Sequence, residues 1–362
     1  MTSRRRFLQL SAAALGLRAA GLRAGVEAPA PGALRVLVLG GTGFIGPHQI
    51  DALLAGGHEV TIFNRGRRAG LYGSRVEELT GDRDPDEGAG LSALAGDRQW
   101  DAVIDNSGYY PRHVRASAEL LRDRVRRYLF VSTVAVYDFD QGERFAEGGP
   151  LAPMADPGNE TMAGGRYGPL KAECDRIVRD VMGENCTVVR PPYIVGPGDT
   201  TNRFTYWVDR IHRGGDVLGP AAPEREIQFV DARDLCRWIV ELVASDTPGI
   251  FNAAGPASPI SREGLLWGLR AMTSSPVRFH WASEAVLAEL GIEPPMLARD
   301  FPVHFENGAA MAAGLRFRPL AETAADTLTW WHEQPAERRA SPRGFIAPEK
   351  ERAALSRLAR SR

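Results

Sequence analysis

The chain has few of the features that assign a protein to a specialised class. It contains three cysteines in 362 residues, and no two of them have the spacing of a zinc or redox motif. Because an odd number also argues against a disulfide framework, we expect Cys174, Cys186 and Cys236 to be buried free thiols. The seven histidines show no ligand-like spacing, so no metal site is predicted. A formal net charge of −1 provides no general attraction to nucleic acid or anionic membranes, and neither is an expected partner.

A long apolar segment is also missing near the N-terminus. The mostly apolar run from Phe7 to Leu17 falls short of the roughly 20 residues that span a bilayer, so no stable membrane insertion is expected. It follows Ser3-Arg4-Arg5-Arg6-Phe7-Leu8-Gln9, which resembles the twin-arginine export signal, although Arg18 and Arg23 interrupt the hydrophobic stretch. We therefore expect residues 1–33 to be a leader that directs the folded protein to the periplasm. A cytoplasmic protein with a disordered leader is the alternative.

The remaining chain has the composition of an ordinary soluble protein, with 44% apolar and 25% charged residues. Short apolar runs alternate with helical stretches. The predicted strands are 34–39, 58–63, one ending near Leu79, 100–104, 128–131 and 186–189. This alternation favours an α/β fold of the Rossmann type, a doubly wound parallel sheet, with a smaller C-terminal substrate lobe.

The pattern also suggests how the chain is divided. Residues 34–191 are predicted to form the dinucleotide-binding domain, and 227–255 to return to it through strands at Ile227–Val230 and Ile250–Asn252. Residues 192–226 and 256–335 are assigned to the substrate lobe. The basic tail, 336–362, is expected to be a solvated terminal helix.

A glycine-rich turn follows the first predicted strand. Its residues are Gly40, Gly41, Thr42, Gly43, Phe44, Ile45 and Gly46. Glycines let the backbone turn tightly and approach a diphosphate, while the amides and the positive dipole end of the following helix favour the anion. The strand before the turn and the helix after it provide the context that this motif requires. The turn therefore predicts a dinucleotide site.

The end of the second strand bears on which dinucleotide is bound. An NAD-binding protein usually has an acidic residue there to bind the ribose 2′-hydroxyl, but this chain has Asn64 and Arg65. Arg65, with Arg67 and Arg68 nearby, can pair with a 2′-phosphate. We expect NADP rather than NAD. The alternative is that these arginines belong to a solvated turn.

A tyrosine and a lysine four residues apart, Tyr167 and Lys171, share one face of a predicted helix. Pro169 is tolerated only in a first helical turn, so Tyr167 is expected at the helix start. A neighbouring ammonium favours the phenolate, and we expect Lys171 to lower the pKa of Tyr167. The pair predicts proton transfer at a carbon–oxygen bond.

These motifs, in this order, resemble the extended short-chain dehydrogenase/reductase family, the NAD(P)-dependent epimerase/dehydratase group. The resemblance covers about residues 34–255. Besides the glycine turn and Tyr167 to Lys171, it rests on Gly81-Asp82-Arg83, on Phe130 to Tyr137, and on Arg190 to Gly198.

The resemblance implies roles for individual residues. Tyr167 exchanges the hydroxyl proton, Lys171 lowers its pKa and holds the nicotinamide ribose, and Thr133 hydrogen-bonds the reacting oxygen, with Ser132 in reserve. It places Asp82 at the adenine. The cofactor-binding residues it implies beyond the glycine turn are Asn64, Arg65, Asp82, Arg83, Asn106, Ser107, Gly108, Tyr167, Lys171, Pro191 and Tyr193.

Three functions remain open at this stage. The first is an oxidoreductase acting on a sugar-like or other polar small-molecule substrate, and the second is a nucleoside-diphosphate-sugar 4-epimerase. The third is a non-catalytic dinucleotide- or RNA-binding member of the fold, because Asn64-Arg65-Gly66 and the Tyr167 motif look most like a subgroup akin to the chloroplast stem-loop-binding proteins. The segment Phe204–Trp207, with Arg203, either lines the substrate pocket or packs in the lobe, and Tyr109-Tyr110 present the same choice. Family members often dimerise, so a homodimer is possible.

Overall fold

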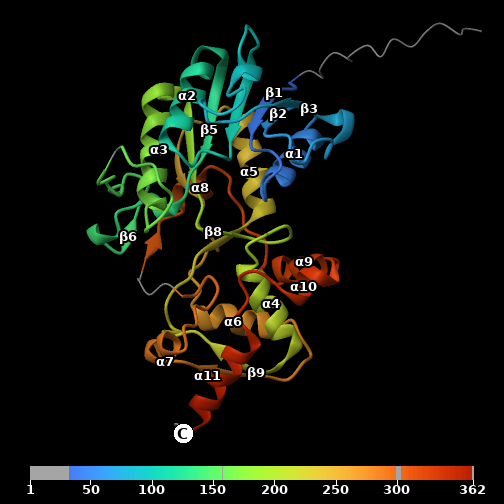
Figure 1. The fold of residues 1–362 in the computed structure, drawn as a ribbon, viewed down its shortest axis with the longest axis vertical. Coiled ribbons are helices and arrows are strands. Elements are labelled where there is room, and N and C mark those ends of the chain that lie inside the picture. The colour runs from blue at the N-terminus through green and yellow to red at the C-terminus, as the bar shows by residue number, and fades with distance from the viewer. Residues whose placement is uncertain (1–31, 157, 299–302, 361–362) are drawn as a thin grey trace, which may run out of the picture.

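The computed structural model describes residues 32–360, except residues 157 and 299–302. Its larger part is an α/β domain, and its smaller part is a lobe at one end of that domain (Figure 1). The predicted export leader lies almost entirely outside the described residues. No helix in the described part of the chain is both long and apolar enough to cross a membrane.

The α/β domain is organised around one parallel sheet of seven strands in the order β11-β7-β5-β4-β1-β2-β3. The strands are β1 Arg35–Leu39, β2 Glu59–Asn64, β3 Glu77–Thr80, β4 Trp100–Asp105, β5 Val125–Val131, β7 Cys186–Arg190 and β11 Gly249–Asn252. The central strands are buried along almost their whole length because helices cover both faces of the sheet, and this explains their uninterrupted Val/Leu/Ile runs. The chain reverses its direction across the sheet between β1 and β4, the position where such folds bind ligands.

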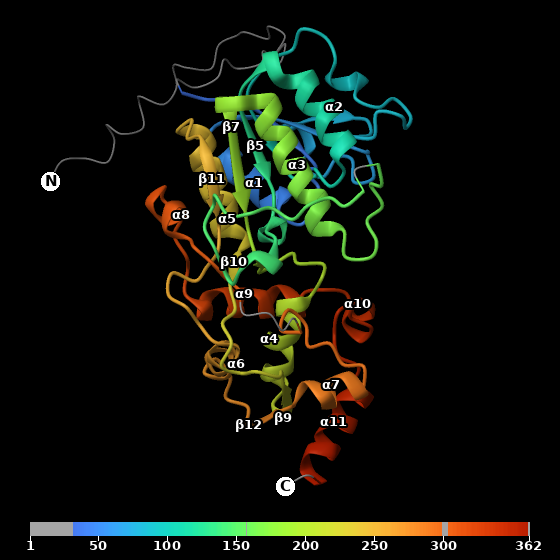
Figure 2. The same cartoon turned by 90° about the vertical axis from the view of Figure 1, so that its left-hand side faces the viewer.

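Two pairs of helices cover this sheet (Figure 2). Helices α1 (Gly46–Ala55) and α5 (Ala232–Ala244) share one apolar cluster with the sheet, and α2 (Pro111–Leu121) and α3 (Tyr167–Met182) share the other. Pro111 occupies the first turn of α2, where its missing amide proton costs no hydrogen bond. The predicted Rossmann-type fold is therefore confirmed.

The elements outside the main sheet are short, and most of them form the lobe; β6, β13 and α8 instead pack on the α/β domain. Three two-stranded parallel sheets pair β8 with β10, β9 with β12, and β6 with β13. Their bounds are β6 Arg144–Phe145, β8 Tyr193–Val195, β9 Gly215–Gly219, β10 Phe229–Asp231, β12 Val277–Trp281 and β13 His304–Phe305. The remaining helices are α4 Arg203–Arg213, α6 Arg262–Arg270, α7 Glu284–Glu289, α8 Gly308–Ala312, α9 Leu320–His332, α10 Ala336–Ala340 and α11 Pro348–Arg360.

Two expectations about the end regions need correction. The strand expected at Ile227–Val230 is β10, which pairs with β8 in a separate small sheet, whereas α5 and β11 return to the large domain. Helix α8, from the segment 256–335 assigned to the lobe, also packs on the large domain against β11. The tail does contain a terminal helix, α11, but this helix is docked on the lobe rather than merely solvated. Its Glu351 and Ala354 are buried, because a small apolar cluster and an ion pair hold this face against the lobe.

Candidate active site

The glycine turn connects β1 to α1, as predicted. Gly40 has φ +88°, a left-handed value that favours glycine. A Cβ on Gly46 would overlap the carbonyl oxygen of Gly41, so the first turn of α1 can approach the loop only if residue 46 has no side chain. At the exposed Gly43, an added Cβ would meet only the Gly40 carbonyl oxygen, at an ordinary contact distance of 3.8 Å. Gly46 therefore shapes the turn, and Gly43 leaves room for a ligand.

The end of β2 presents an unsatisfied donor next to this turn. The Asn64 Oδ1 atom accepts a hydrogen bond from the Gly66 amide at 2.7 Å. Its Nδ2 atom is buried and has no hydrogen-bond partner among the described residues. A buried amide donor of this kind is costly unless it binds a ligand or water. The Arg68 guanidinium donates to the Thr42 carbonyl at 2.8 Å and fixes the loop.

The two residues that follow Gly81 after β3, Asp82 and Arg83, have different roles. Asp82 lines the cavity beside the glycine turn. Arg83 lines it too, but its guanidinium is buried in an ion pair with Asp105 at the end of β4. It also donates to Ser117 on α2 at 2.5 Å. Arg83 therefore holds β3, β4 and α2 together, and its side chain is committed to the wall of the cavity.

The exit of β4 is fixed by side-chain amides. Asn106 and Gln49 of α1 exchange two hydrogen bonds, at 2.5 and 3.0 Å. Ser107 packs against Gly40 so closely that a Cβ there would lie 2.8 Å from Ser107 Cβ. A Cβ on Gly108 would overlap the Phe130 ring. The predicted cofactor residues of β1 and β4 are thus in direct contact.

A cavity of about 490 Å³ opens between these strand ends, within the range of small-molecule and cofactor sites. The predicted residues that line it are Gly40, Thr42, Gly43, Asn64, Arg65, Asp82, Arg83, Asn106 and Ser107. Gly41, Phe44, Ile45 and Gly46 build the turn behind it. Pro191 is buried, and its carbonyl accepts from the Val134 amide at 3.1 Å. Tyr109 and Tyr110, which were suggested for the substrate pocket, line this cavity.

Tyr167 is the first residue of α3, as Pro169 predicts, and Thr133 is near enough to affect the pKa of its phenol. A Cβ on Gly168 would overlap the Ala135 carbonyl oxygen, so this glycine lets the helix start approach the turn at Thr133. Thr133 Oγ1 also accepts from the Ala135 amide at 3.2 Å, which orients the hydroxyl. The sequence motif contained Gly168, but only the structure shows why it is needed.

Lys171 is 2% exposed and is one of only two lysines in the chain. Its Nζ donates to the carbonyls of Gly108, at 2.7 Å, and Val131, at 2.9 Å. The same atom lies 4.2 Å from the centroid of the Phe130 ring and 5.4 Å from that of Tyr109. Burial lowers the pKa of Lys171 to about 8. No motif or spacing in the sequence indicates that the Tyr109 ring lies beside this ammonium.

The prediction that Lys171 lowers the pKa of Tyr167 is wrong for this conformation. The protein packed around the phenol, with a contribution from Tyr109, raises the pKa of Tyr167 to about 12, although the residue is still 40% exposed to solvent. Thr133 and the positive charge of Arg203 oppose this rise in pKa without reversing it. The Lys171 ammonium donates to two backbone carbonyls rather than to the phenol.

A second cavity, of about 770 Å³, lies between the α/β domain and the lobe. Tyr167 and Thr133 line it on one side, together with the predicted Tyr193, and Arg203 lines it from the lobe. Phe204, Tyr206 and Trp207 do not line it, because they are almost fully buried in the core of the lobe. The packing alternative for this aromatic segment is therefore correct, and Arg203 alone faces the cavity.

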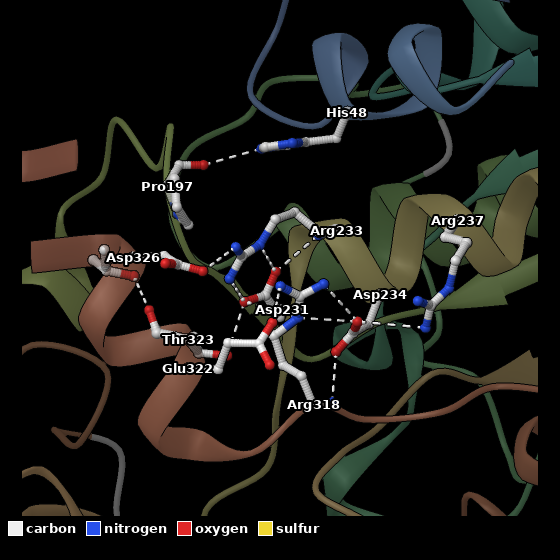
Figure 3. A network of polar contacts seen from close by, with 11 residues as sticks. His48, Pro197, Asp231, Arg233, Asp234, Arg237, Arg318, Glu322, Thr323 and Asp326 are labelled. Carbon is white, nitrogen blue, oxygen red and sulfur yellow. Dashed lines mark hydrogen bonds and ion pairs between the residues drawn. The ribbon is translucent and has the colours of Figure 1, made fainter. Parts of the chain in front are cut away.

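A network of charged groups fixes the lobe beside this cavity (Figure 3). Asp231, the N-cap of α5, accepts from Arg233 Nη2 at 2.7 Å and from the Thr323 hydroxyl of α9 at 2.8 Å. Burial alone would raise the pKa of Asp231, but these hydrogen bonds hold it below its usual value. Arg318 pairs with Asp234 at 2.9 Å. The network ties α9 of the lobe to α5 of the domain.

Comparison with known proteins agrees with this geometry. A sequence model of the NAD dependent epimerase/dehydratase family matches residues 36–254, more than half of the chain. The chain belongs to that family. Membership confirms the predicted family, the fold and the prediction of an NAD(P)-dependent enzyme of this type.

Individual relatives are more distant. The chain is 24% identical over 314 residues to the chloroplast stem-loop binding protein of 41 kDa b from Arabidopsis thaliana, covering 82% of this chain and 74% of that protein. It is 30% identical over 185 residues to UDP-glucose 4-epimerase 2 from Oryza sativa subsp. japonica, covering 43% of each chain. This second match spans less than half of the epimerase.

Among solved structures, the enzyme WbmH of Bordetella bronchiseptica, determined in complex with NAD+, aligns with a TM-score of 0.63. The alignment covers 84% of this chain and all of WbmH at 17% identity. At this identity the likeness supports the fold alone.

Proposed function

We propose that this protein is an NADP-dependent oxidoreductase that acts on an alcohol or carbonyl carbon of a sugar-like or other polar substrate. One observation carries the proposal. Tyr167 and Thr133 both line the larger cavity, while Lys171 of the same helix contacts Gly108 at the exit of β4. A proton-transfer group therefore stands between the substrate cavity and the strand ends that form the cofactor cavity.

The residues around the smaller cavity fit a dinucleotide phosphate. Gly43, which has no side chain, and the start of α1 offer room and amide donors for a diphosphate. The unsatisfied Asn64 Nδ2 needs an acceptor, and Arg65 lines the same cavity and suits a 2′-phosphate. Asp82 lines this cavity too, and we expect it to contact the adenine. When bound, the cofactor supplies the nicotinamide carbon that donates or accepts the hydride.

Tyr167 and Thr133 control the proton at the reacting oxygen. A phenol with a pKa of about 12 is protonated at neutral pH, so Tyr167 is able to donate a proton to a substrate carbonyl as it is reduced. Thr133, oriented by the Ala135 amide, hydrogen-bonds the same oxygen. Alcohol oxidation needs the phenolate, and we infer that Lys171 must then turn from the Gly108 and Val131 carbonyls toward the phenol.

A nucleotide-sugar 4-epimerase is the second candidate. The rice relative bears that name, and three arginines, Arg203, Arg262 and Arg343, line the larger cavity, where they suit a diphosphate. The two functions differ in their redox balance. An epimerase regenerates its cofactor in every turnover, whereas an oxidoreductase changes the redox state of the cofactor in proportion to product.

The decisive variant is Tyr167→Phe. We expect turnover to fall by about a thousandfold, the size typical for loss of a general acid–base group, while the dissociation constant for NADP changes less than about twofold. Tyr206→Phe is the matched control, because the Tyr206 hydroxyl is buried in the lobe without a hydrogen-bond partner among the described residues.

The assay is nicotinamide absorbance against a panel of neutral sugars, acidic sugars and nucleotide sugars. Native mass spectrometry of the purified protein identifies any nicotinamide nucleotide that co-purifies and its stoichiometry. Unchanged turnover in Tyr167→Phe would remove the assigned role. Complete inactivity of the wild type across the panel, with no dinucleotide bound, would instead favour the non-catalytic alternative.

A further inference from the structure

The C-terminal segment forms part of the larger cavity. Arg343 and Gly344 line it, although both lie far along the chain from Tyr167. The Arg343 carbonyl accepts a hydrogen bond from Asn202 Nδ2 at 3.0 Å. Gly344 has φ +80°, and a Cβ there would overlap the Thr201 carbonyl oxygen. The segment is therefore seated directly against the residues that precede α4.

Contacts after Arg343 keep the segment in this position. The rings of Phe345 and Tyr206 pack edge to face, with centroids 5.2 Å apart. The Arg210 Nε atom of α4 pairs with the Glu351 carboxylate of α11 at 2.8 Å, and both side chains are about 10% exposed. The same carboxylate accepts from the Leu218 amide of β9. The segment that carries Arg343 is thus a fixed part of the lobe.

A second guanidinium reaches the cavity from the start of α4. Arg203 Nε donates to Thr201 Oγ1 at 3.0 Å, and its guanidinium stacks over the Tyr193 ring at 4.8 Å. These two contacts fix its orientation and leave its Nη donors available. Within the described residues, no hydrogen bond or ion pair uses the Arg343 guanidinium. Two arginines from neighbouring backbone positions therefore present unused donors to one cavity.

Acidic residues in this cavity do not cancel that charge by direct pairing. Glu226 is hydrogen-bonded to His304 Nδ1 at 2.8 Å. Glu293 also lines the cavity but forms no ion pair with Arg203 or Arg343 in the part of the chain that the structure describes. The oriented Arg203 guanidinium and the exposed Arg343 guanidinium have free donors and no ion-pair partner among the described residues, and together they suit a planar or tetrahedral oxyanion.

We propose that Arg203 and Arg343 together bind an oxyanion, either a carboxylate or a phosphate, on the substrate of the oxidoreductase. The inference rests on the proposed function, and it narrows the substrate class from polar to anionic. It also gives the C-terminal segment a specificity-determining role through Arg343. Since Arg203 shares its cavity with Tyr167, the anionic group is held on the same side as the reacting carbon–oxygen bond.

The test measures binding directly and does not depend on turnover. With NADP present, the wild-type protein is titrated calorimetrically with sodium glucuronate, inorganic pyrophosphate and neutral glucose. We expect at least one anion to bind at least tenfold more tightly than glucose. Preference for glucuronate identifies a carboxylate substrate, and preference for pyrophosphate identifies a phosphorylated one.

Arg203→Gln and Arg343→Gln are each expected to weaken the binding of the preferred anion by at least tenfold. Their matched controls are Arg213→Gln, at the other end of α4, and Arg339→Gln, in the same C-terminal segment; both are expected to bind within twofold of wild type. Thermal unfolding of each variant shows that the lobe is folded. The proposal is overturned if the anions bind no more tightly than glucose. It is also overturned if the control variants reduce anion affinity as much as Arg203→Gln and Arg343→Gln do.

The same titration separates this inference from the proposed function. Tyr167→Phe removes turnover but leaves the two guanidinium groups in place, so its anion affinity is expected to match that of wild type. Retained anion binding in a protein that never turns over would refute the oxidoreductase while keeping the anion site. Turnover of neutral substrates without anion binding would support the oxidoreductase and refute the anion site.

Discussion

The two cavities of this protein are built in different ways. The cofactor cavity is lined by residues between 40 and 113, which lie at or just after the ends of four neighbouring strands. The substrate cavity takes side chains from segments that extend from Thr133 to Gly344. A parallel sheet brings the ends of its strands together by its topology alone, whereas the second cavity requires that the lobe be completed and docked. The first cavity is therefore encoded locally, and the second depends on long-range packing.

The largest effect that would distinguish the two cavities is expected from a variant that weakens the docking of α11 on the lobe. Glu351→Gln leaves the largely buried Arg210 guanidinium without a countercharge, and we expect a loss of about 3 kcal/mol in the free energy of unfolding of the lobe. Denaturant unfolding measures this change. Glu349→Gln, an exposed position on the same helix, is the control and should change stability by less than about 0.5 kcal/mol.

Cofactor affinity in Glu351→Gln is the informative second measurement. We expect the dissociation constant for NADP to stay within about twofold of wild type under native conditions, because none of the residues that line the cofactor cavity touches α11. A parallel loss of NADP binding would show that the two cavities are not independent.

A pair of glycine variants tests the cofactor side. In Gly46→Ala the new methyl group meets the Gly41 carbonyl, and we expect a loss of about 2 kcal/mol from overpacking. In Gly43→Ala the methyl group makes only an ordinary contact with the Gly40 carbonyl oxygen, so stability should be unchanged while dinucleotide affinity falls. Thermal unfolding and NADP titration of both variants separate the two roles. Equal destabilisation by both would contradict the assignment of Gly43 to ligand approach.

The smallest expected effect concerns the choice of dinucleotide. Arg65→Glu should weaken NADP binding by about tenfold, which is consistent with loss of one charge-assisted hydrogen bond of about 1.5 kcal/mol. The affinity for NAD should stay nearly unchanged. Arg75→Glu, an exposed arginine outside the cavity, is the control for charge reversal. If NADP and NAD are weakened equally, Arg65 does not contact the 2′-phosphate.

The sequence predicted local features well because each depends on neighbours in the chain. The glycine turn, the start of α3 at Tyr167 and the apolar strands all follow from short-range patterns. The sequence could not show that Lys171 turns to the carbonyls of Gly108 and Val131. Nor could it show that Arg343 reaches the substrate cavity, since no spacing rule relates it to Arg203.

The tail illustrates the same limit. Its composition is that of a solvated helix, and most of α11 is indeed exposed. The helix nevertheless docks on the lobe, because the Glu351 carboxylate accepts hydrogen bonds from the buried Arg210 guanidinium. A single long-range ion pair of this kind leaves no periodic signal in the sequence.

The docking of α11 has a consequence for how the protein is made. Domains generally fold as their residues leave the ribosome, N-terminal parts first. The residues of the dinucleotide cradle are synthesised early, but Arg343 and the Glu351 anchor emerge only after the rest of the lobe. A nascent chain is therefore expected to acquire its ability to hold a nucleotide well before it is able to select a substrate.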